Sequence, residues 1–324
     1  MISKDKLINR ILVGIFIAVC MIGMVVMAAL STHYEYLREL EAFIISAIIL
    51  IAIIEMRRAL GKERIPDNFS WVIWAYGIGI GPAYILFGYV GVVFFTLLCF
   101  CFSTITALHI NRADSLLYIA FLFIYPGLLM ASMLYINRCA STQYISEASP
   151  LYQYVVVDKW SIVAGQRYSQ LLPYNAIGFA FIFAVSSLTD VCAFFVGITL
   201  GKHKLCPHIS PKKTVEGAIG GLFGGLIGSF LVYLVFEVWQ LFGQGLGLSI
   251  HGLSKTNLLI VYVVIGLIGS FLTQIGDLLA SLVKRYCGVK DYGKILGTHG
   301  GVMDRFDGIM LNAVFVASVY MFII

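Results

Sequence analysis

Residues 257–283 read NLLIVYVVIGLIGSFLTQIGDLLASLV, an apolar run that becomes polar only toward its second half. As a helix, a run of this length crosses a bilayer, because about 20 residues span the hydrocarbon core of roughly 30 Å. Four polar residues recur at steps of three and four and therefore share one helix face: Gln274, Asp277, Ser281 and Lys284. A charge near a helix centre costs about 2.5 to 3.5 kcal/mol in lipid, so this face is expected to line a cavity.

Similar apolar runs fill most of the 324-residue chain. Apolar residues make up 60% of the composition and charged residues 12%, which is too much hydrocarbon for the core of an ordinary soluble domain. The sequence therefore predicts an all-α integral membrane protein, a polytopic bundle of about nine transmembrane helices. The third and fourth runs are poorly separated, so eight or ten crossings also fit the pattern. The predicted spans are 8–30, 39–56, 69–87, 89–109, 116–136, 172–197, 214–242, 257–283 and 309–324.

Basic residues are distributed unevenly among the loops between these runs. An N-terminus in the cytoplasm places 17 of the 22 Lys and Arg residues on the cytoplasmic side, as the positive-inside rule requires. This orientation makes 198–213 and 284–308 cytoplasmic. Topology accounts for the net charge of +5, so we expect no nucleic-acid partner. The seven cysteines are scattered without a CxxC pair and predict neither a disulfide framework nor a zinc site.

The chain divides into three parts by composition. Residues 1–136 are predicted to form N-terminal transmembrane helices, and their acidic residues, such as Glu39 and Glu41, are interpreted as interfacial because they lie mainly at the ends of spans. Residues 137–171 are more polar and predict an external loop. Residues 172–324 place polar groups inside the spans, and we expect them to form a C-terminal catalytic transmembrane domain.

A second polar stretch follows the run 172–197. Ser210 before Pro211 predicts a helix N-cap with Pro at the first helical position. Lys212 and Lys213 would then lie in the first helical turn, where the dipole disfavours cations, so we interpret the pair as anion ligands. Glycines spaced four apart follow in two ladders and indicate close helix packing: Gly217, Gly221 and Gly225, and Gly220, Gly224 and Gly228.

The third polar stretch is KDYGKILGTHGGVMDRFDG, residues 290–308, with five glycines and three aspartates. Asp304 and Asp307 lie one turn apart at a predicted helix start, where carboxylates are favoured and can jointly hold a hard cation. Asp277, several basic residues and glycine turns complete the parts of Mg²⁺-assisted phosphoryl or nucleotidyl transfer. The membrane setting predicts a lipid co-substrate.

The order of these residues is more specific than their spacing. It resembles, position by position, the signature of phosphatidate cytidylyltransferases, also called CDP-diacylglycerol synthases. The residues that carry this resemblance are Ser281-x-Val283-Lys284-Arg285-x₄-Lys290-Asp291-x-Gly293-x₂-Leu296-Gly297-x-His299-Gly300-Gly301-Val302-x-Asp304-Arg305-Phe306-Asp307. Upstream, the segments around Asp190, 201–204, 210–217 and 276–278 are similar to the same family. The match covers about 186–308, and Val215 stands where many relatives have Trp.

The resemblance implies a homodimeric membrane enzyme that uses Mg²⁺ to convert CTP and phosphatidate to CDP-diacylglycerol and pyrophosphate. It also implies a second cation, with K⁺ as a candidate. We expect the bacterial cytoplasmic membrane as its location. The implied metal ligands are Asp277, Asp304 and Asp307, and Lys284, Arg285 and His299 complete the implied catalytic set. The implied substrate-binding residues are Ser210, Lys212, Lys213, Ser281, Lys284, Arg285 and Lys290. For His299, a structural role in the glycine-rich turn is an equal alternative.

Two other classes of function stay open at this point. A polyprenol or dolichol kinase would also use CTP in a membrane, but it would transfer the γ-phosphoryl group and release CDP. A cation-coupled transporter would use Asp190 and Asp277 as ion ligands. Transporters often contain inverted repeats of spans, whereas the polar motifs here all lie in the second half of the chain.

Overall fold

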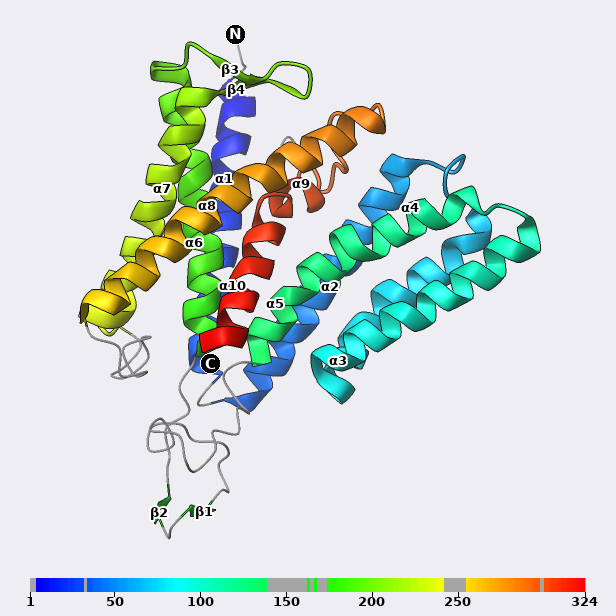
Figure 1. Cartoon of the computed structure of the whole chain (residues 1–324), viewed down its shortest axis with the longest axis horizontal. Helices are drawn as coiled ribbons and strands as arrows, with labels where there is room; N and C mark the ends of the chain where they lie inside the picture. The colour runs from blue at the N-terminus through cyan, green and yellow to red at the C-terminus, as the bar shows by residue number, and fades with distance from the viewer. Residues whose placement is uncertain are drawn as a thin grey trace. The chain divides into compact units, whose positions relative to one another are not determined.

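The computed structural model describes residues 4–31, 34–138, 162–163, 166–167, 174–241, 255–297 and 300–323. Within these residues the chain is almost entirely helical (Figure 1). Most of the predicted polar loop 137–171, and His299, lie outside the described residues. The helices are α1 (Lys4–Leu30), α2 (Glu35–Leu60), α3 (Ser70–Ile110), α4 (Asp114–Leu122), α5 (Leu129–Arg138), α6 (Tyr174–Thr199), α7 (Val215–Tyr233), α8 (Lys255–Tyr286), α9 (Met303–Phe306) and α10 (Ile309–Ile323).

Six helical segments in the described part of the chain are long and apolar enough to cross a membrane. They confirm the prediction of a polytopic all-α membrane protein. The count of nine stays a prediction, because it needs three more crossings than these six. Two of them would be α2, which carries charged residues near both ends, and α10, which has only 15 residues. The third would come from α3, which is one helix here but covers two predicted spans. The six segments are Leu12–Leu30, Asp67–Ile110, Asp114–Arg138, Tyr174–Thr199, Val215–Val238 and Asn257–Tyr286.

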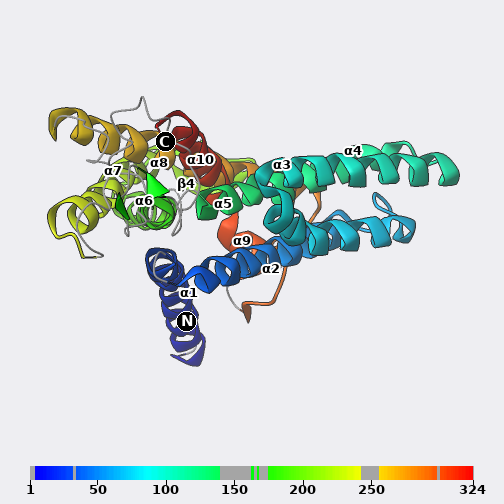
Figure 2. The same cartoon turned by 90° about the horizontal axis from the view of Figure 1, so that it is seen from below.

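Helix α3 folds back on itself at Gly88, where the backbone adopts φ 65° and ψ −157°. Glycine accepts a positive φ without the steric cost that a Cβ would bring. Side chains far apart in sequence meet across this bend: the ring centroids of Tyr76 and Phe95 are 6.3 Å apart, and those of Trp71 and Phe102 are 5.9 Å apart. The two legs of α3 therefore run antiparallel (Figure 2), and they correspond to the separate predicted spans 69–87 and 89–109.

A short π-helical segment, η2 (Phe123–Leu128), joins α4 to α5 around Pro126. Proline has no backbone N–H, so a helix interrupted by it needs other hydrogen bonds. Next to this segment, the Tyr76 hydroxyl of α3 donates to the Phe123 carbonyl at 3.1 Å. A single-turn 3₁₀ helix, η1 (Asp67–Phe69), leads into α3.

The chain forms two compact units, each built from segments distant in sequence. The first unit comprises Met1–Cys20, Ala42–Tyr135 and Gly276–Val314. The second comprises Met21–Glu41, Ile136–Ile275 and Phe315–Ile324. The predicted polar stretches are therefore divided between them, because 276–308 belongs to the first unit and 186–217 to the second.

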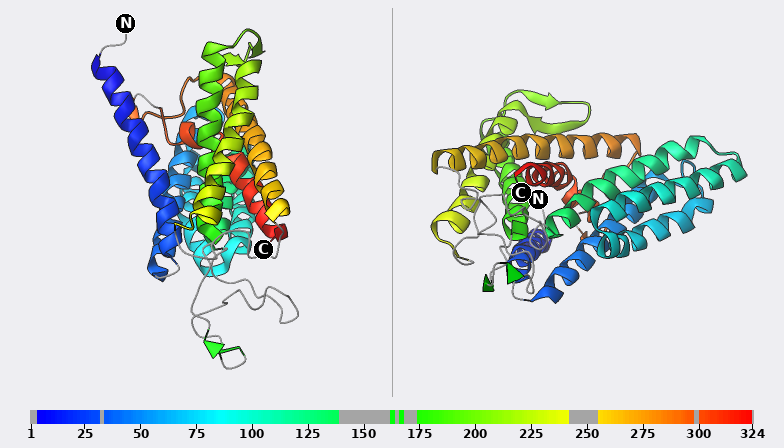
Figure 3. Two further views of the ribbon diagram at one scale, coloured as in Figure 1. Left: turned by 90° about the vertical axis from the view of Figure 1, so that its left-hand side faces the viewer. Right: turned by 60° about the horizontal axis from the view of Figure 1, so that its bottom comes forward.

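In the second unit, α6, α7 and α8 lie side by side (Figure 3), and the glycine ladders of α7 set how closely its neighbours approach. Gly220, Gly224 and Gly228 face α6, where a Cβ on Gly228 would lie 2.7 Å from the Ala184 carbonyl oxygen. Gly221 and Gly225 face α8, where a Cβ on Gly221 would lie 2.9 Å from Gln274 Nε2. These contacts confirm that the ladders serve helix packing. A π-helical turn, η3 (Leu234–Val238), continues α7.

Helix α7 is preceded by an antiparallel hairpin of β3 (Lys204–Cys206) and β4 (Ser210–Thr214), which projects beyond the ends of α6 and α7 (Figure 3). The helix begins at Val215, and the Thr214 hydroxyl caps it by accepting the Gly217 N–H at 3.1 Å. The predicted N-cap at Ser210 is therefore wrong. Pro211 instead lies on β4, because proline is also tolerated in an edge strand. Thr214, closer to the glycine ladders, provides the cap of α7. A second short hairpin pairs β1 (Ile162–Val163) with β2 (Gln166–Arg167).

Candidate functional site

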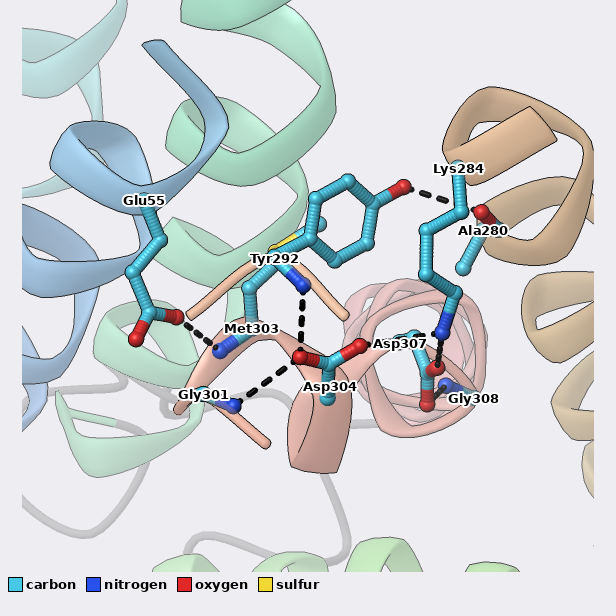
Figure 4. A network of polar contacts seen from close by, with 9 residues as sticks. All are labelled: Glu55, Ala280, Lys284, Tyr292, Gly301, Met303, Asp304, Asp307 and Gly308. Atoms are coloured by element: carbon cyan, nitrogen blue, oxygen red, sulfur yellow. Dashed lines mark hydrogen bonds and ion pairs between the residues drawn. The ribbon is translucent and has the colours of Figure 1, made fainter. Parts of the chain in front are cut away.

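In the first unit, Lys284 on the last turn of α8 lies between two of the predicted metal ligands (Figure 4). Its Nζ is 3.0 Å from Asp304 Oδ1 and 3.6 Å from Asp307 Oδ2. Asp277, two turns earlier on α8, also interacts electrostatically with this ammonium group. The side chains of Lys284 and Asp304 are only 14% and 3% exposed, so the interactions are little screened by water. One ammonium group thus pairs with two of the three predicted metal ligands.

Each of the two aspartates uses its other oxygen to fix the backbone. Asp304 Oδ2 accepts the N–H groups of Tyr292 at 2.8 Å and Gly301 at 2.9 Å. Asp307 Oδ1 accepts the N–H of Gly308 at 2.9 Å. Because these bonds orient the carboxylates, Asp304 Oδ1 and Asp307 Oδ2 are both directed toward Lys284.

Tyr292 connects the loop after α8 back to that helix. It is 5% exposed, its hydroxyl donates to the Ala280 carbonyl at 2.9 Å, and Lys284 Nζ lies 5.3 Å from its ring centroid. Burial raises the pKa of the Tyr292 phenol above its ordinary value, so this group is neutral at physiological pH. The residue therefore acts as a neutral anchor between the loop and α8.

Glu55 of α2 belongs to the same network, although the sequence did not predict it. It is 1% exposed, and its Oε2 accepts the N–H of Met303 at 2.8 Å. A Cβ on Gly293 or Gly301 would overlap its carboxylate. The interfacial interpretation of acidic residues in 1–136 is wrong for Glu55, and it is wrong also for Glu41, which is 0% exposed. No local pattern could have revealed the contact, because Glu55 and Met303 are 248 positions apart.

The remaining predicted residues of the first unit surround this network less closely. Ser281 is half-buried on α8, one turn before Lys284, whereas Arg285 and Lys290 are exposed. Gln274, which the sequence places on the same polar face, instead donates to the Ala218 carbonyl of α7 at 3.2 Å and serves packing in the second unit.

Ser210, Lys212 and Lys213 lie on β4 in the second unit. Glu216, at the start of α7, holds the turn before β3: its carboxylate accepts the N–H of Lys202 at 3.1 Å and contacts His203 Nδ1 at 2.6 Å. The hairpin therefore holds Lys212 on an ordered, exposed strand and not on a helical turn as predicted.

The donor set around Lys284 fits a hard cation such as Mg²⁺. Mg²⁺ prefers oxygen ligands and commonly takes only one or two carboxylates beside water and phosphate oxygens. Asp304 and Asp307 each offer one such oxygen, already directed at a positive centre. Among the residues that the structure describes, no three His, Cys, Asp or Glu side chains form a ready-made metal cluster. The arrangement thus matches a shared metal–phosphate site better than a closed protein cage.

Sequence comparison places the chain among the nucleotidyltransferases. The profile of the cytidylyltransferase family matches residues 8–323, so the chain belongs to that family. A phosphatidate cytidylyltransferase of Staphylococcus aureus is 35% identical over 216 residues, covering 57% of this chain and 75% of the relative. Enzymes of the same name from Staphylococcus saprophyticus and Staphylococcus epidermidis are 45% and 43% identical over 130 residues, covering 40% of this chain and 44% of each relative. The resemblance predicted from the motifs is confirmed, and the family match extends into the N-terminal helices.

Proposed function

We propose that the protein transfers the cytidylyl group of CTP to phosphatidate, giving CDP-diacylglycerol and pyrophosphate. The observation that carries this proposal is the cluster of Asp304, Asp307 and Lys284 in a membrane chain of the cytidylyltransferase family. Its Staphylococcus relatives bear the name of this activity. The proposed place of action is a bacterial cytoplasmic membrane, with the N-terminus and 284–308 in the cytoplasm.

The proposed reaction needs no strong general base. An oxygen of the ionised phosphatidate phosphate attacks the α-phosphorus of CTP and forms the new P–O bond. The bond between the α-phosphorus and the oxygen bridging to the β-phosphorus breaks in line, and its electron pair leaves with pyrophosphate. Positioning and charge stabilisation then provide most of the catalysis, as in other phosphoryl transfers.

The residues near Lys284 have proposed roles in this reaction. Asp304 and Asp307, with Asp277, would hold Mg²⁺, which supplies neutralising charge for the triphosphate when bound. Lys284 and Arg285 on α8 neutralise the phosphates that meet at the site. The further proposed ligands of the substrates are Ser210, Lys212, Lys213, Ser281 and Lys290, with His299 orienting phosphate or structuring its turn. A second cation, such as K⁺, is part of the proposal.

The decisive experiment follows the label of CTP. Detergent-purified protein is incubated with phosphatidate, Mg²⁺ and CTP labelled at either the α or the γ phosphate. Transfer of α label to lipid with release of pyrophosphate, lost in Asp307→Asn, would support the proposal. The matched control is Asp114→Asn, which removes an exposed aspartate paired with Arg112 and should leave transfer unchanged.

Two other outcomes would reject this proposal. Transfer of γ label to a supplied polyprenol would identify a kinase, and transfer of neither label by folded protein would favour a cation-coupled transporter. The proposed homodimer is tested separately, by measuring the mass of the detergent-solubilised protein with light scattering. Accessibility of engineered cysteines at 1–3 and 290–294 in sealed vesicles tests the proposed orientation.

A further inference from the structure

Glu55 is buried on α2, yet its side-chain hydrogen bond goes to the segment that carries the aspartates. We infer that Glu55 is a positioning residue, which holds the backbone at 293 and 301–303 so that Asp304 and Asp307 face their common cation. For the identity of that cation the inference rests on the proposed function. The role concerns the N-terminal part of the chain, where the motif resemblance assigned no site residue.

The hydrogen bonds of Glu55 end next to the metal ligands. Its Oε2 accepts the N–H of Met303, the first residue of α9, at 2.8 Å, and the Val302 backbone interacts with the same carboxylate. Asp304 follows Met303 directly, so a shift of this peptide moves Asp304 as well. A buried N–H that loses its acceptor costs about 1 to 3 kcal/mol, so a shift of the Met303 peptide away from Glu55 is opposed.

Three glycines of the 290–308 stretch lie against the carboxylates of Glu55 and Asp304, where a larger residue would not fit. Gly293 and Gly301 leave no room for a Cβ beside Glu55, and a Cβ on Gly300 would lie 2.8 Å from Asp304 Oδ2. The Gly301 and Met303 peptides lie between Glu55 and Asp304 (Figure 4), and Gly301 N–H donates to Asp304 while Met303 N–H donates to Glu55. The loop is therefore held from both sides.

The environment of Glu55 favours positioning over direct contact with substrate. The side chain is buried, and its Oε1 has no hydrogen-bond partner among the described residues. Glu41, on the same helix, provides a matched comparison: it is also buried with an unpaired Oε1, but its Oε2 accepts from Asn137 in the second unit. Of these two glutamates, Glu55 is the one whose hydrogen bond, within the part of the chain that the structure describes, goes to the aspartate loop.

Three variants separate positioning from charge. Glu55→Gln keeps the length and an acceptor oxygen for Met303 N–H but removes the charge. Glu55→Asp keeps the charge but withdraws the acceptor by one methylene. Glu55→Ala removes both. Glu41→Gln and Glu41→Ala are the controls, because they disturb an equally buried glutamate on the same helix.

The assay titrates Mn²⁺, in place of Mg²⁺, into the full-length detergent-solubilised protein and follows free Mn²⁺ by electron paramagnetic resonance. We expect Glu55→Asp and Glu55→Ala to bind Mn²⁺ about tenfold more weakly or worse, which corresponds to the loss of roughly one buried hydrogen bond. Glu55→Gln should stay within about threefold of the wild type, and both Glu41 variants should match it.

Several outcomes would overturn the inference. If Glu55→Asp binds Mn²⁺ as well as or better than Glu55→Gln, the charge of residue 55 matters and not its position. If Glu55→Asp binds Mn²⁺ with wild-type affinity, the position of the acceptor oxygen does not matter. If the wild-type protein binds no Mn²⁺, the inference is also rejected. Glu55→Ala can fail to fold without affecting this test, because the Gln and Asp variants carry the decision. Transfer of α label by the wild type is measured separately, so failure of the proposed activity is distinguishable.

Discussion

Replacing Lys284 by Met should make the stability of the protein depend more strongly on Mg²⁺. Lys284 Nζ lies 3.0 Å from Asp304 and 3.6 Å from Asp307, and the three side chains are 14%, 3% and 13% exposed. With an effective dielectric constant of about 20, each pair attracts by about 5 kcal/mol before desolvation is subtracted. Removing one partner from such a buried pair costs about 3 to 5 kcal/mol. We expect a loss of this size in the unfolding free energy when divalent cations are chelated.

The assay is thermal unfolding of both proteins in one detergent, at one scan rate, with EDTA or with saturating Mg²⁺. A cation present at about 100 times its Kd stabilises the folded state by about 2.7 kcal/mol. In the wild type that gain is opposed by displacement of the ammonium group, whereas in Lys284→Met it is not. Lys62→Met is the control, because its pair with Asp67 is highly exposed and contributes little. Equal Mg²⁺ shifts in wild type and Lys284→Met would refute the idea that ammonium and cation share the same carboxylates.

Variants at four further positions test individual predictions by measuring unfolding. Burial raises the pKa of Tyr292 above its ordinary value of about 10. Its contribution to the unfolding free energy is therefore complete below about pH 10 and declines above that pH. Tyr292→Phe should therefore make the loss of stability at alkaline pH shallower, by up to about 1.4 kcal/mol per pH unit. Thr214→Ala should cost about 1 kcal/mol by removing the cap of α7, while Thr214→Ser should retain most of it, as measured by melting temperature. Gly228→Ala should destabilise, because its Cβ would lie 2.7 Å from the Ala184 carbonyl, whereas Gly14→Ala, with nothing within 4 Å, should stabilise by about 0.5 to 1 kcal/mol.

Features that depend on short-range periodicity were predictable from the sequence. Apolar runs gave helices close to their observed positions, because hydrophobic length is the main constraint on a membrane helix. The four-residue glycine ladders predicted close packing, which the contacts of Gly221 and Gly228 confirm. The three-residue step between Asp304 and Asp307 placed both carboxylates beside Lys284.

Features decided by competing local signals or by distant contacts were not predictable. Both Ser210–Pro211 and Thr214 could start a helix. Because β4 (Ser210–Thr214) pairs with β3, the helix begins after Thr214 and not at Ser210. Glu55 lies at the end of a predicted span, where an acidic residue is normally solvated. Its burial against the Met303 backbone depends on a pairing of distant segments that no spacing rule describes.

Charge compensation connects the stability of this site with its proposed chemistry. Carboxylates buried in a membrane protein need partners before any substrate arrives, because an unpaired buried charge is costly. Lys284 is that partner for Asp304 and Asp307, and backbone N–H groups of the loop are partners for Glu55 and Asp304. The same bonds leave Asp304 Oδ1 and Asp307 Oδ2 directed at one point. On the proposed mechanism, a cation that takes the place of the ammonium group therefore meets ligands that are already oriented, and the released Lys284 is free to neutralise phosphate.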